Sequence, residues 1–192
     1  LIFTLTLALQ YCHTRNVAHR NIKPSNILFH NKRPALADFD FHLFNRSQPL
    51  IIHNSSLPYA APEIVKNINN VLDDLSDERA SDIWSLGVVL YQILSGRLPW
   101  SATNRDDLIN QIKRGIYSFT PKIVPMARDL ISKMMDIEPT HRITFHEIHP
   151  WLSKIKATNF RSFAGRSICL SSSLSEIHPR ISQAKSFTGF PL

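Results

Sequence analysis

The segment of residues 82–94, with the sequence DIWSLGVVLYQIL, constrains the fold more than any other part of the chain. Its apolar side chains fall on almost every face of a helix, which is typical of a helix that is buried on most sides. Ser81 can cap a helix that begins at Asp82, and Ser95-Gly96 can end it. Because residues 83–94 are too few to cross a bilayer, we expect this helix to lie at the centre of a domain.

Weaker patterns predict the helices that surround this central one. Apolar residues at helical spacing indicate four of them, over residues 1–13, 106–114 and 126–135 and from Thr144 onward. Either Thr103 or Asn104 can cap the helix over residues 106–114. Thr144 and Glu147 have the spacing of a capping box. The expected fold is therefore mainly α.

The remaining segments predict a hairpin, a loop and a tail. Two short apolar runs, residues 27–29 and 35–37, flank a polar turn and predict a small β-hairpin. Residues 40–62 show no periodicity, which predicts a long loop of the kind that often carries function. Beyond residue 156 the chain has eight serines, four Lys or Arg residues and few apolar anchors. The composition thus predicts a folded domain over residues 1–156 and a disordered, Ser-rich basic tail over residues 157–192.

Charge and cysteine content narrow the classes of partner. The chain has 22 Lys and Arg against 15 Asp and Glu, a net charge of +7. This balance permits nucleic-acid binding, but the basic residues are scattered, so we expect no nucleic-acid partner. Two distant cysteines and the absence of a signal-peptide pattern favour an intracellular, cytoplasmic protein without a membrane partner. His146 and His149 lack further ligands at matching spacing, so no structural metal is expected.

Five short motifs occur in one order over the chain. They are the octapeptide HRNIKPSN of residues 19–26, Asp38-Phe39-Asp40, Ala61-Pro62-Glu63, the hexapeptide DIWSLG of residues 82–87, and Arg142. The set resembles the H-R-D-x-K-x-x-N, D-F-G, A-P-E and D-x-W-S-x-G signatures of the eukaryotic Ser/Thr protein kinases. The similarity is greatest to the calmodulin-dependent and AMP-activated branch.

This resemblance implies the larger, C-terminal lobe of the kinase fold, over roughly residues 1–153. The Gly-rich loop and strand lysine of the smaller N-terminal lobe have no counterpart in the sequence, so we expect that lobe to be absent. ATP and Mg²⁺ are then expected as cofactors only if an N-terminal lobe is supplied. Protein substrates or protein partners are the expected binding class.

The resemblance also assigns roles to individual residues. Asn26 and Asp38 take the metal-binding positions, since Mg²⁺ prefers hard oxygen ligands, and both would bind the cofactor together with Lys23. Lys23 would place a positive charge beside the transferring phosphate. Arg20 would pair with a phosphate on the activation loop, and Ser56 would help to shape the substrate groove. The signature residues expected to hold the fold are His19, Phe39, Glu63, Asp82, Trp84 and Arg142.

Two residues depart from the family pattern. Asn21 replaces the catalytic aspartate, and an amide can orient a hydroxyl but cannot take its proton at neutral pH. The expected loss is roughly 10²–10⁴-fold in rate. Asp40 replaces the glycine of D-F-G, whose backbone freedom other residues reach only at a cost.

Three interpretations follow. The chain is a pseudokinase-like module that binds partners, an incomplete piece of a working Ser/Thr kinase, or a decaying gene product with no function of its own. A lobe without its companion would expose apolar surface and favour aggregation, which is the signature of the third interpretation.

Overall fold

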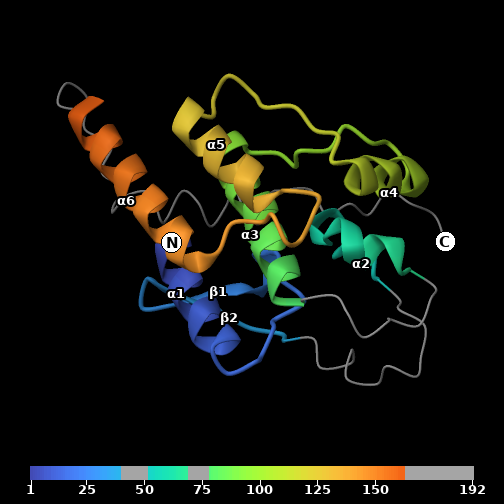
Figure 1. Cartoon of the computed structure of the whole chain (residues 1–192), viewed down its shortest axis with the longest axis horizontal. Coiled ribbons are helices and arrows are strands. Elements are labelled where there is room, and N and C mark those ends of the chain that lie inside the picture. The colour runs from blue at the N-terminus through green and yellow to red at the C-terminus, as the bar shows by residue number, and fades with distance from the viewer. Residues whose placement is uncertain (40–51, 69–77, 163–192) are drawn as a thin grey trace.

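The structure is a computed structural model that describes residues 1–39, 52–68 and 78–162, with side chains up to residue 155. Short 3-10 helices and a two-stranded sheet accompany longer helices (Figure 1). The elements in chain order are α1 (Ile2–His13), η1 (Pro24–Asn26), β1 (Ile27–His30), β2 (Arg33–Leu36), η3 (Leu57–Tyr59), α2 (Pro62–Lys66), α3 (Glu78–Ser95), α4 (Arg105–Arg114), α5 (Pro125–Met134) and α6 (Phe145–Ser162).

Helix α3 runs through the middle of the molecule, as its apolar sequence predicts (Figure 1). It packs against α1, α5 and η3, and its residues 81–92 are all buried. Gly87 allows the close contact with α5, because a Cβ at this position would lie 2.9 Å from the Cβ of Met134 and 2.9 Å from the Cγ of Met135. The absence of a side chain at Gly87 therefore lets α3 and α5 pack closely.

The start of α3 corrects one prediction. The helix begins at Glu78 rather than Asp82, so Ser81 lies inside its first turn and is not the cap. The Ser81 hydroxyl donates instead to the carbonyl oxygen of Glu78, at 2.6 Å. Residues 78–81 contain only one small apolar residue, Ala80, and show no apolar period, so the sequence pattern placed the helix start four residues too late.

The hairpin of β1 and β2 is antiparallel, with Ile27 opposite Leu36 and His30 opposite Arg33. Its two turn residues, Asn31 and Lys32, have φ values of 49° and 63°. Left-handed angles at both central positions suit the right-handed twist of the strands in a two-residue hairpin. The predicted hairpin is thus confirmed, with the second strand starting at Arg33, one residue before the Pro34 expected at its start.

The C-terminal helices follow the predicted caps. The Asn104 side chain accepts from the backbone N–H of Asp107 at 2.8 Å and so caps α4. The Thr144 N–H and hydroxyl both donate to Glu147, at 2.9 and 2.8 Å, ahead of α6. Helix α6 continues to Ser162, beyond the predicted domain boundary at residue 156. The rest of the predicted tail, residues 163–192, lies outside the described residues, so the division stays a prediction.

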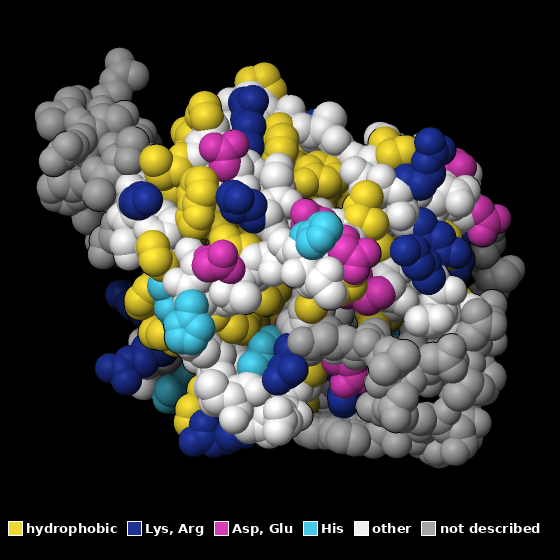
Figure 2. All heavy atoms as spheres, in the orientation of Figure 1, with side chains coloured by type: hydrophobic (Ala, Val, Ile, Leu, Met, Phe, Trp, Pro, Cys, Tyr) yellow, Lys and Arg dark blue, Asp and Glu magenta, His cyan; other side chains and the backbone are white. Residues whose placement is uncertain are grey.

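The surface shows no single dominant charge on the face in Figure 2. Lys and Arg side chains lie scattered there among acidic, histidine and apolar ones (Figure 2). Within the described residues, no helix has both the length and the apolar character needed to span a membrane.

Candidate active site

The buried carboxylate of Asp82 fixes the backbone of the loop between α1 and η1 to the central helix. Asp82 lies in the first part of α3 and is fully buried. It accepts hydrogen bonds from the backbone N–H groups of His19 (2.7 Å) and Arg20 (2.8 Å) and contacts the Nε2 of His13 at 2.7 Å. A buried carboxylate needs several donors to offset its desolvation. These donors come from two segments, so Asp82 sets the path of the loop that follows α1.

His19 packs the next segment against this loop. Its ring centroid lies 4.2 Å from that of Phe39, and its Nδ1 accepts from the backbone N–H of Asn21 at 3.3 Å. Burial lowers the pKa of His19 below its ordinary value, and the ring is therefore neutral near pH 7. Its Nε2 has no hydrogen-bond partner among the described residues.

Asn21, Asn26 and Asp38 form a compact polar cluster. The Nδ2 of Asn21 donates to the Oδ2 of Asp38 at 2.8 Å, and the Nδ2 of Asn26 donates to the same oxygen at 3.3 Å. Asn26 also donates to the carbonyl oxygen of Asn21 at 2.8 Å. Asp38 has φ of 61°, a left-handed conformation that Asp tolerates better than most residues. Asp38 thus combines a left-handed backbone conformation with a carboxylate that contacts the amides of Asn21 and Asn26.

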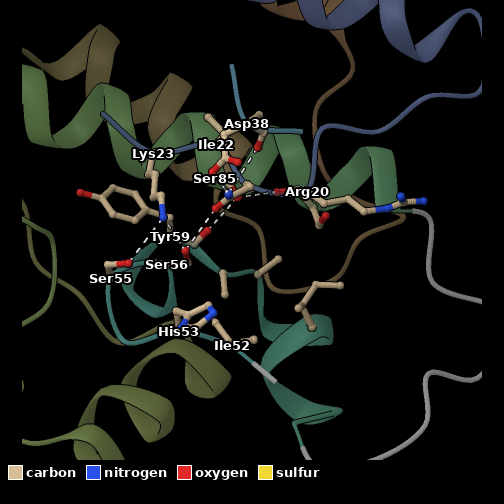
Figure 3. A pocket seen from close by; sticks show the side chains of 15 residues that line it. Arg20, Ile22, Lys23, Asp38, Ile52, His53, Ser55, Ser56, Tyr59 and Ser85 are labelled. Carbon is tan, nitrogen blue, oxygen red and sulfur yellow. Dashed lines mark hydrogen bonds between the residues drawn. The ribbon is translucent and has the colours of Figure 1, made fainter. Parts of the chain in front are cut away.

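A second set of contacts joins this cluster to the segment before η3. The Nζ of Lys23 donates to the hydroxyl of Ser56 at 2.9 Å and more weakly to that of Ser55 at 3.5 Å. The Ser56 hydroxyl donates in turn to the Oδ1 of Asn21 at 3.1 Å. Figure 3 shows Lys23 directed at both serines. The structure thus links the predicted residues Lys23, Asn21 and Ser56 directly.

Arg20 is bound to a side chain that the motifs did not indicate. Its Nε donates to Glu78 at 2.8 Å, and its Nη2 contacts the same carboxylate oxygen. Arg20 also has φ of 65°, a conformation that is costly for a residue other than glycine. Together with Asp82, Glu78 attaches this loop to the start of α3. The predicted pairing of Arg20 with a loop phosphate stays a prediction.

A pocket of about 180 Å³ opens beside these residues (Figure 3). Polar and aliphatic side chains both line it, and they include Arg20, Lys23, Asp38, Ile52, Ser55 and Ile64. Tyr59 also lines it, with its hydroxyl donating to Gln92 at 2.8 Å and burial raising its pKa to about 12. Ser85 of α3 donates to the carbonyl oxygen of Tyr59 at 2.7 Å. Two residues of the central helix, Ser85 and Gln92, therefore fix the position of Tyr59 in the pocket lining.

A buried ion pair joins Arg142 to Glu63 at the start of α2. Arg142 donates to both carboxylate oxygens of Glu63, at 2.7 and 3.0 Å. The guanidinium carbon of Arg142 lies 5.4 Å from the Trp84 ring centroid, within range of a cation–π interaction. Trp84 stacks on Trp100 at 6.3 Å, and the Trp100 Nε1 donates to the carbonyl oxygen of Pro58. These contacts hold α2 and η3 against α3.

The comparison with protein families agrees with this arrangement. Residues 1–152 match the family described as protein kinase domain. The chain belongs to the protein kinase family. Its described residues form the mainly helical C-terminal lobe of that fold, and the resemblance to eukaryotic Ser/Thr protein kinases is confirmed.

Curated relatives within this kinase family are Ser/Thr protein kinases. The chain is 38% identical over 163 residues to a probable serine/threonine-protein kinase of Dictyostelium discoideum, covering 83% of this chain and 18% of that protein. It is 37% identical over 153 residues to the SNF-related serine/threonine-protein kinase of Rattus norvegicus, covering 77% and 20%. It is 38% identical over 146 residues to serine/threonine protein kinase OSK3 of Oryza sativa subsp. indica, covering 74% and 28%. The chain thus spans 18% to 28% of the length of these relatives.

In this kinase lobe, the predicted metal-binding residues lie together, and their polar groups are hydrogen-bonded rather than turned toward a common cation. Mg²⁺ requires hard oxygen ligands. The Oδ2 of Asp38 instead accepts two amide N–H groups, and the Oδ1 of Asn26 accepts from Ser25 at 3.4 Å. Elsewhere in the described residues, no group of three or more His, Cys, Asp or Glu side chains is placed to hold a metal ion.

Several site residues of this kinase lobe escaped the sequence analysis. Neither Glu78 nor His13 belongs to one of the five motifs, so the motif pattern offered no signal for them. Tyr59 could have been found from its place between Ser56 and Ala61-Pro62-Glu63. Asp40, the second departure from the kinase pattern, lies outside the described residues.

Proposed function

We propose that this chain is a pseudokinase-like C-terminal lobe that binds protein partners and transfers phosphate poorly or not at all. One observation carries the proposal: Asn21 stands where an active kinase has its catalytic aspartate, and its amide is bound at both ends, to Asp38 and to Ser56. A carboxylate at this position could accept the proton of a substrate hydroxyl. A neutral amide cannot do so at neutral pH.

The other kinase residues of this site keep positions suited to binding. Lys23 would supply positive charge to a phosphate, while Asn26 and Asp38 would need to turn oxygen atoms toward a cation. The family uses ATP and Mg²⁺, which here would require an N-terminal lobe to complete the nucleotide pocket. We therefore propose partner binding, rather than nucleotide binding, as the main function of this chain.

The pocket beside Lys23 suits a peptide segment of a protein partner. Its polar lining includes Lys23, Ser55 and Arg20, and its aliphatic lining includes Ile52 and Ile64. Such a mixed lining is common in sites that combine apolar contact with a few polar groups for orientation. A peptide with one acceptor group and one aliphatic side chain matches this lining.

A phosphotransfer assay tests the proposal directly. The purified chain, and the longest gene product that contains it, are incubated with radiolabelled Mg-ATP beside Lys23→Ala and Asp38→Ala variants. We expect the same background signal from every protein in the assay. A signal that both variants abolish would overturn the proposal. A cooperative thermal transition of the chain serves as the folding control and would also argue against a decaying gene product.

Peptide binding is tested separately on an immobilised peptide library. Ile64→Asp places a charge among the aliphatic side chains that line the pocket. Ile116→Asp serves as the control, because Ile116 is exposed and does not line the pocket. We expect peptides that bind the natural chain to lose at least about tenfold in affinity for Ile64→Asp only. Equal binding to both variants would place partner binding elsewhere.

The second candidate function is that of a piece of an active Ser/Thr protein kinase. The observation that favours it is the retained cluster of Lys23, Asn26 and Asp38, held by the anchor at Asp82. It predicts that Asn21→Asp raises phosphotransfer markedly in the longest gene product. An Asn21→Asp protein that stays inactive beside an intact N-terminal lobe would exclude it.

A further inference from the structure

The contacts between Lys23 and Asp38 form one continuous chain of hydrogen bonds. It runs from the Nζ of Lys23 to the Oγ of Ser56 (2.9 Å), on to the Oδ1 of Asn21 (3.1 Å), and from the Nδ2 of Asn21 to the Oδ2 of Asp38 (2.8 Å). The chain joins three segments: the loop after α1, the segment before η3 and the residues after β2. It therefore couples the two sides of the pocket.

The chemistry of its two ends fixes the direction of every hydrogen bond. An ammonium group has only donors and a carboxylate has only acceptors. Lys23 must therefore donate to Ser56, and Asp38 must accept from Asn21. The single hydroxyl proton of Ser56 is left for the Oδ1 of Asn21. The donor and acceptor chemistry of Lys23 and Asp38 therefore fixes the orientation of the Asn21 amide, with its Nδ2 toward Asp38 and its Oδ1 toward Ser56.

This orientation determines what Asp38 can bind. The Oδ2 of Asp38 already accepts from Asn21 and also from Asn26 at 3.3 Å. An amide nitrogen does not ligate a hard cation, so a cation that binds this Oδ2 atom would have to displace these donors. Turning the Asn21 amide over would also break its bond from Ser56. A carboxylate at position 21 would instead face Asp38 at close range, and like charges there favour a bound cation.

We propose that Asn21 takes the place of a divalent cation at Asp38, so that the hydrogen bonds from Lys23 through Ser56 and Asn21 stabilise this carboxylate without metal. The inference deepens the proposed function, since it rests on Asn21 replacing the catalytic aspartate. It assigns to this residue a positioning role beyond the loss of a base: Asn21 holds the segment around Ser56 on the loop around Lys23. The site is thereby built for a metal-free state.

Manganese binding to the full chain, without nucleotide, tests the proposal. Mn²⁺ affinity is measured by electron paramagnetic resonance for the natural chain, for Asn21→Asp and for Asn31→Asp, which adds the same charge on the exposed hairpin turn. We expect Asn21→Asp to bind Mn²⁺ at least about tenfold more tightly than the other two. With EDTA, Asn21→Asp should have the lowest melting temperature of the three, and Mn²⁺ should raise it the most. Equal Mn²⁺ affinities in the three proteins would overturn the proposal.

A second pair of variants tests the chain of hydrogen bonds with Asn21 unchanged, in case Asn21→Asp does not fold. Ser56→Ala removes the link that fixes the amide, whereas Ser55→Ala removes only the longer contact with Lys23. We expect Ser56→Ala to bind Mn²⁺ several-fold more tightly than Ser55→Ala, because the freed amide can turn its oxygen to the cation. Equal Mn²⁺ affinities of Ser56→Ala and Ser55→Ala would refute the role of these hydrogen bonds. None of these readouts uses phosphotransfer, so an active kinase with this order of Mn²⁺ affinities would reject the proposed function alone.

Discussion

Arg142 and Glu63, 79 positions apart in the sequence, form a two-armed ion pair with distances of 2.7 Å from Nη1 to Oε1 and 3.0 Å from Nη2 to Oε2. The Arg142 side chain is completely buried and that of Glu63 is 12% exposed. Arg142 also donates to the carbonyl oxygens of Ala80 and Asp136. One guanidinium therefore joins α2, the start of α3 and the segment after α5.

Replacing Glu63 should destabilise the fold strongly. Glu63→Ala leaves the buried guanidinium of Arg142 without its counter-charge, and breaking a buried pair in this way costs about 3–5 kcal/mol. We expect the free energy of unfolding in urea to fall by about 3 kcal/mol, with exposed Glu138→Ala as the matched control. A difference below about 0.5 kcal/mol between these variants would show that the pair does not stabilise the fold.

Asp82→Asn should loosen the loop that carries Asn21. The amide has one acceptor oxygen in place of two and points an N–H₂ group at the donors of His19 or Arg20. Because hydrogen bonds to charged groups contribute about 1.5–3 kcal/mol, we expect a loss of about 3 kcal/mol in unfolding free energy. Faster hydrogen exchange at the amides of His19 and Arg20 should accompany it. Exposed Asp106→Asn should change neither measurement; unchanged exchange in Asp82→Asn would contradict the anchor.

The buried ring of His19 should make stability depend on pH. Burial lowers its pKa from the ordinary value of 6.5, so below that pH the unfolded chain binds a proton that the folded protein resists. This contribution is fully present above pH 6.5 and is lost as the pH falls toward the folded pKa. His19→Phe keeps an aromatic ring beside Phe39 and removes the titrating group.

The measurement is the melting temperature from about pH 7.5 to about pH 5. We expect a smaller decrease for His19→Phe than for the natural chain, whereas exposed His141→Gln should resemble the natural chain. Identical pH profiles for His19→Phe and the natural chain would refute the assignment.

Gly87→Ala should separate α3 from α5. The added Cβ would meet the Cβ of Met134 and the Cγ of Met135, each at 2.9 Å. Overpacking of this kind costs about 1–3 kcal/mol, which exceeds the gain of about 1 kcal/mol in helix propensity. We expect a net loss of about 1 kcal/mol in chemical denaturation. A more stable Gly87→Ala protein would mean that α5 yields to the extra methyl group without strain.

Local patterns were enough to predict the long elements. The nearly uniform apolar sequence of α3, the periodicity of α1 and the caps at Asn104 and Thr144 all reflect interactions between residues close in sequence. The five-residue helix α2 was not predicted, because it is shorter than two turns and shows no period. The early start of α3 was missed for a related reason: its first turn is polar, and Glu78 is placed by its contact with Arg20.

The candidate site divides in the same way. Motif order located Asn21, Lys23, Asn26 and Asp38, because the family signature specifies residue types at set spacings. It did not predict that Glu78 binds Arg20 or that Ser85 donates a hydrogen bond to Tyr59 in the pocket lining. These contacts join residues 26 to 58 positions apart, and their distances depend on how α2, α3 and η3 pack.

By itself, the sequence determined the kinase family, the central position of α3 and the absence of a carboxylate at position 21, since each depends on residue identity and local spacing. Only the tertiary structure decided what the amide at position 21 does. Packing brings Ser56 and Asp38 to opposite ends of Asn21, and the charges of Lys23 and Asp38 then orient every hydrogen bond between them. A sequence specifies which groups can donate or accept, whereas the fold selects which of them meet.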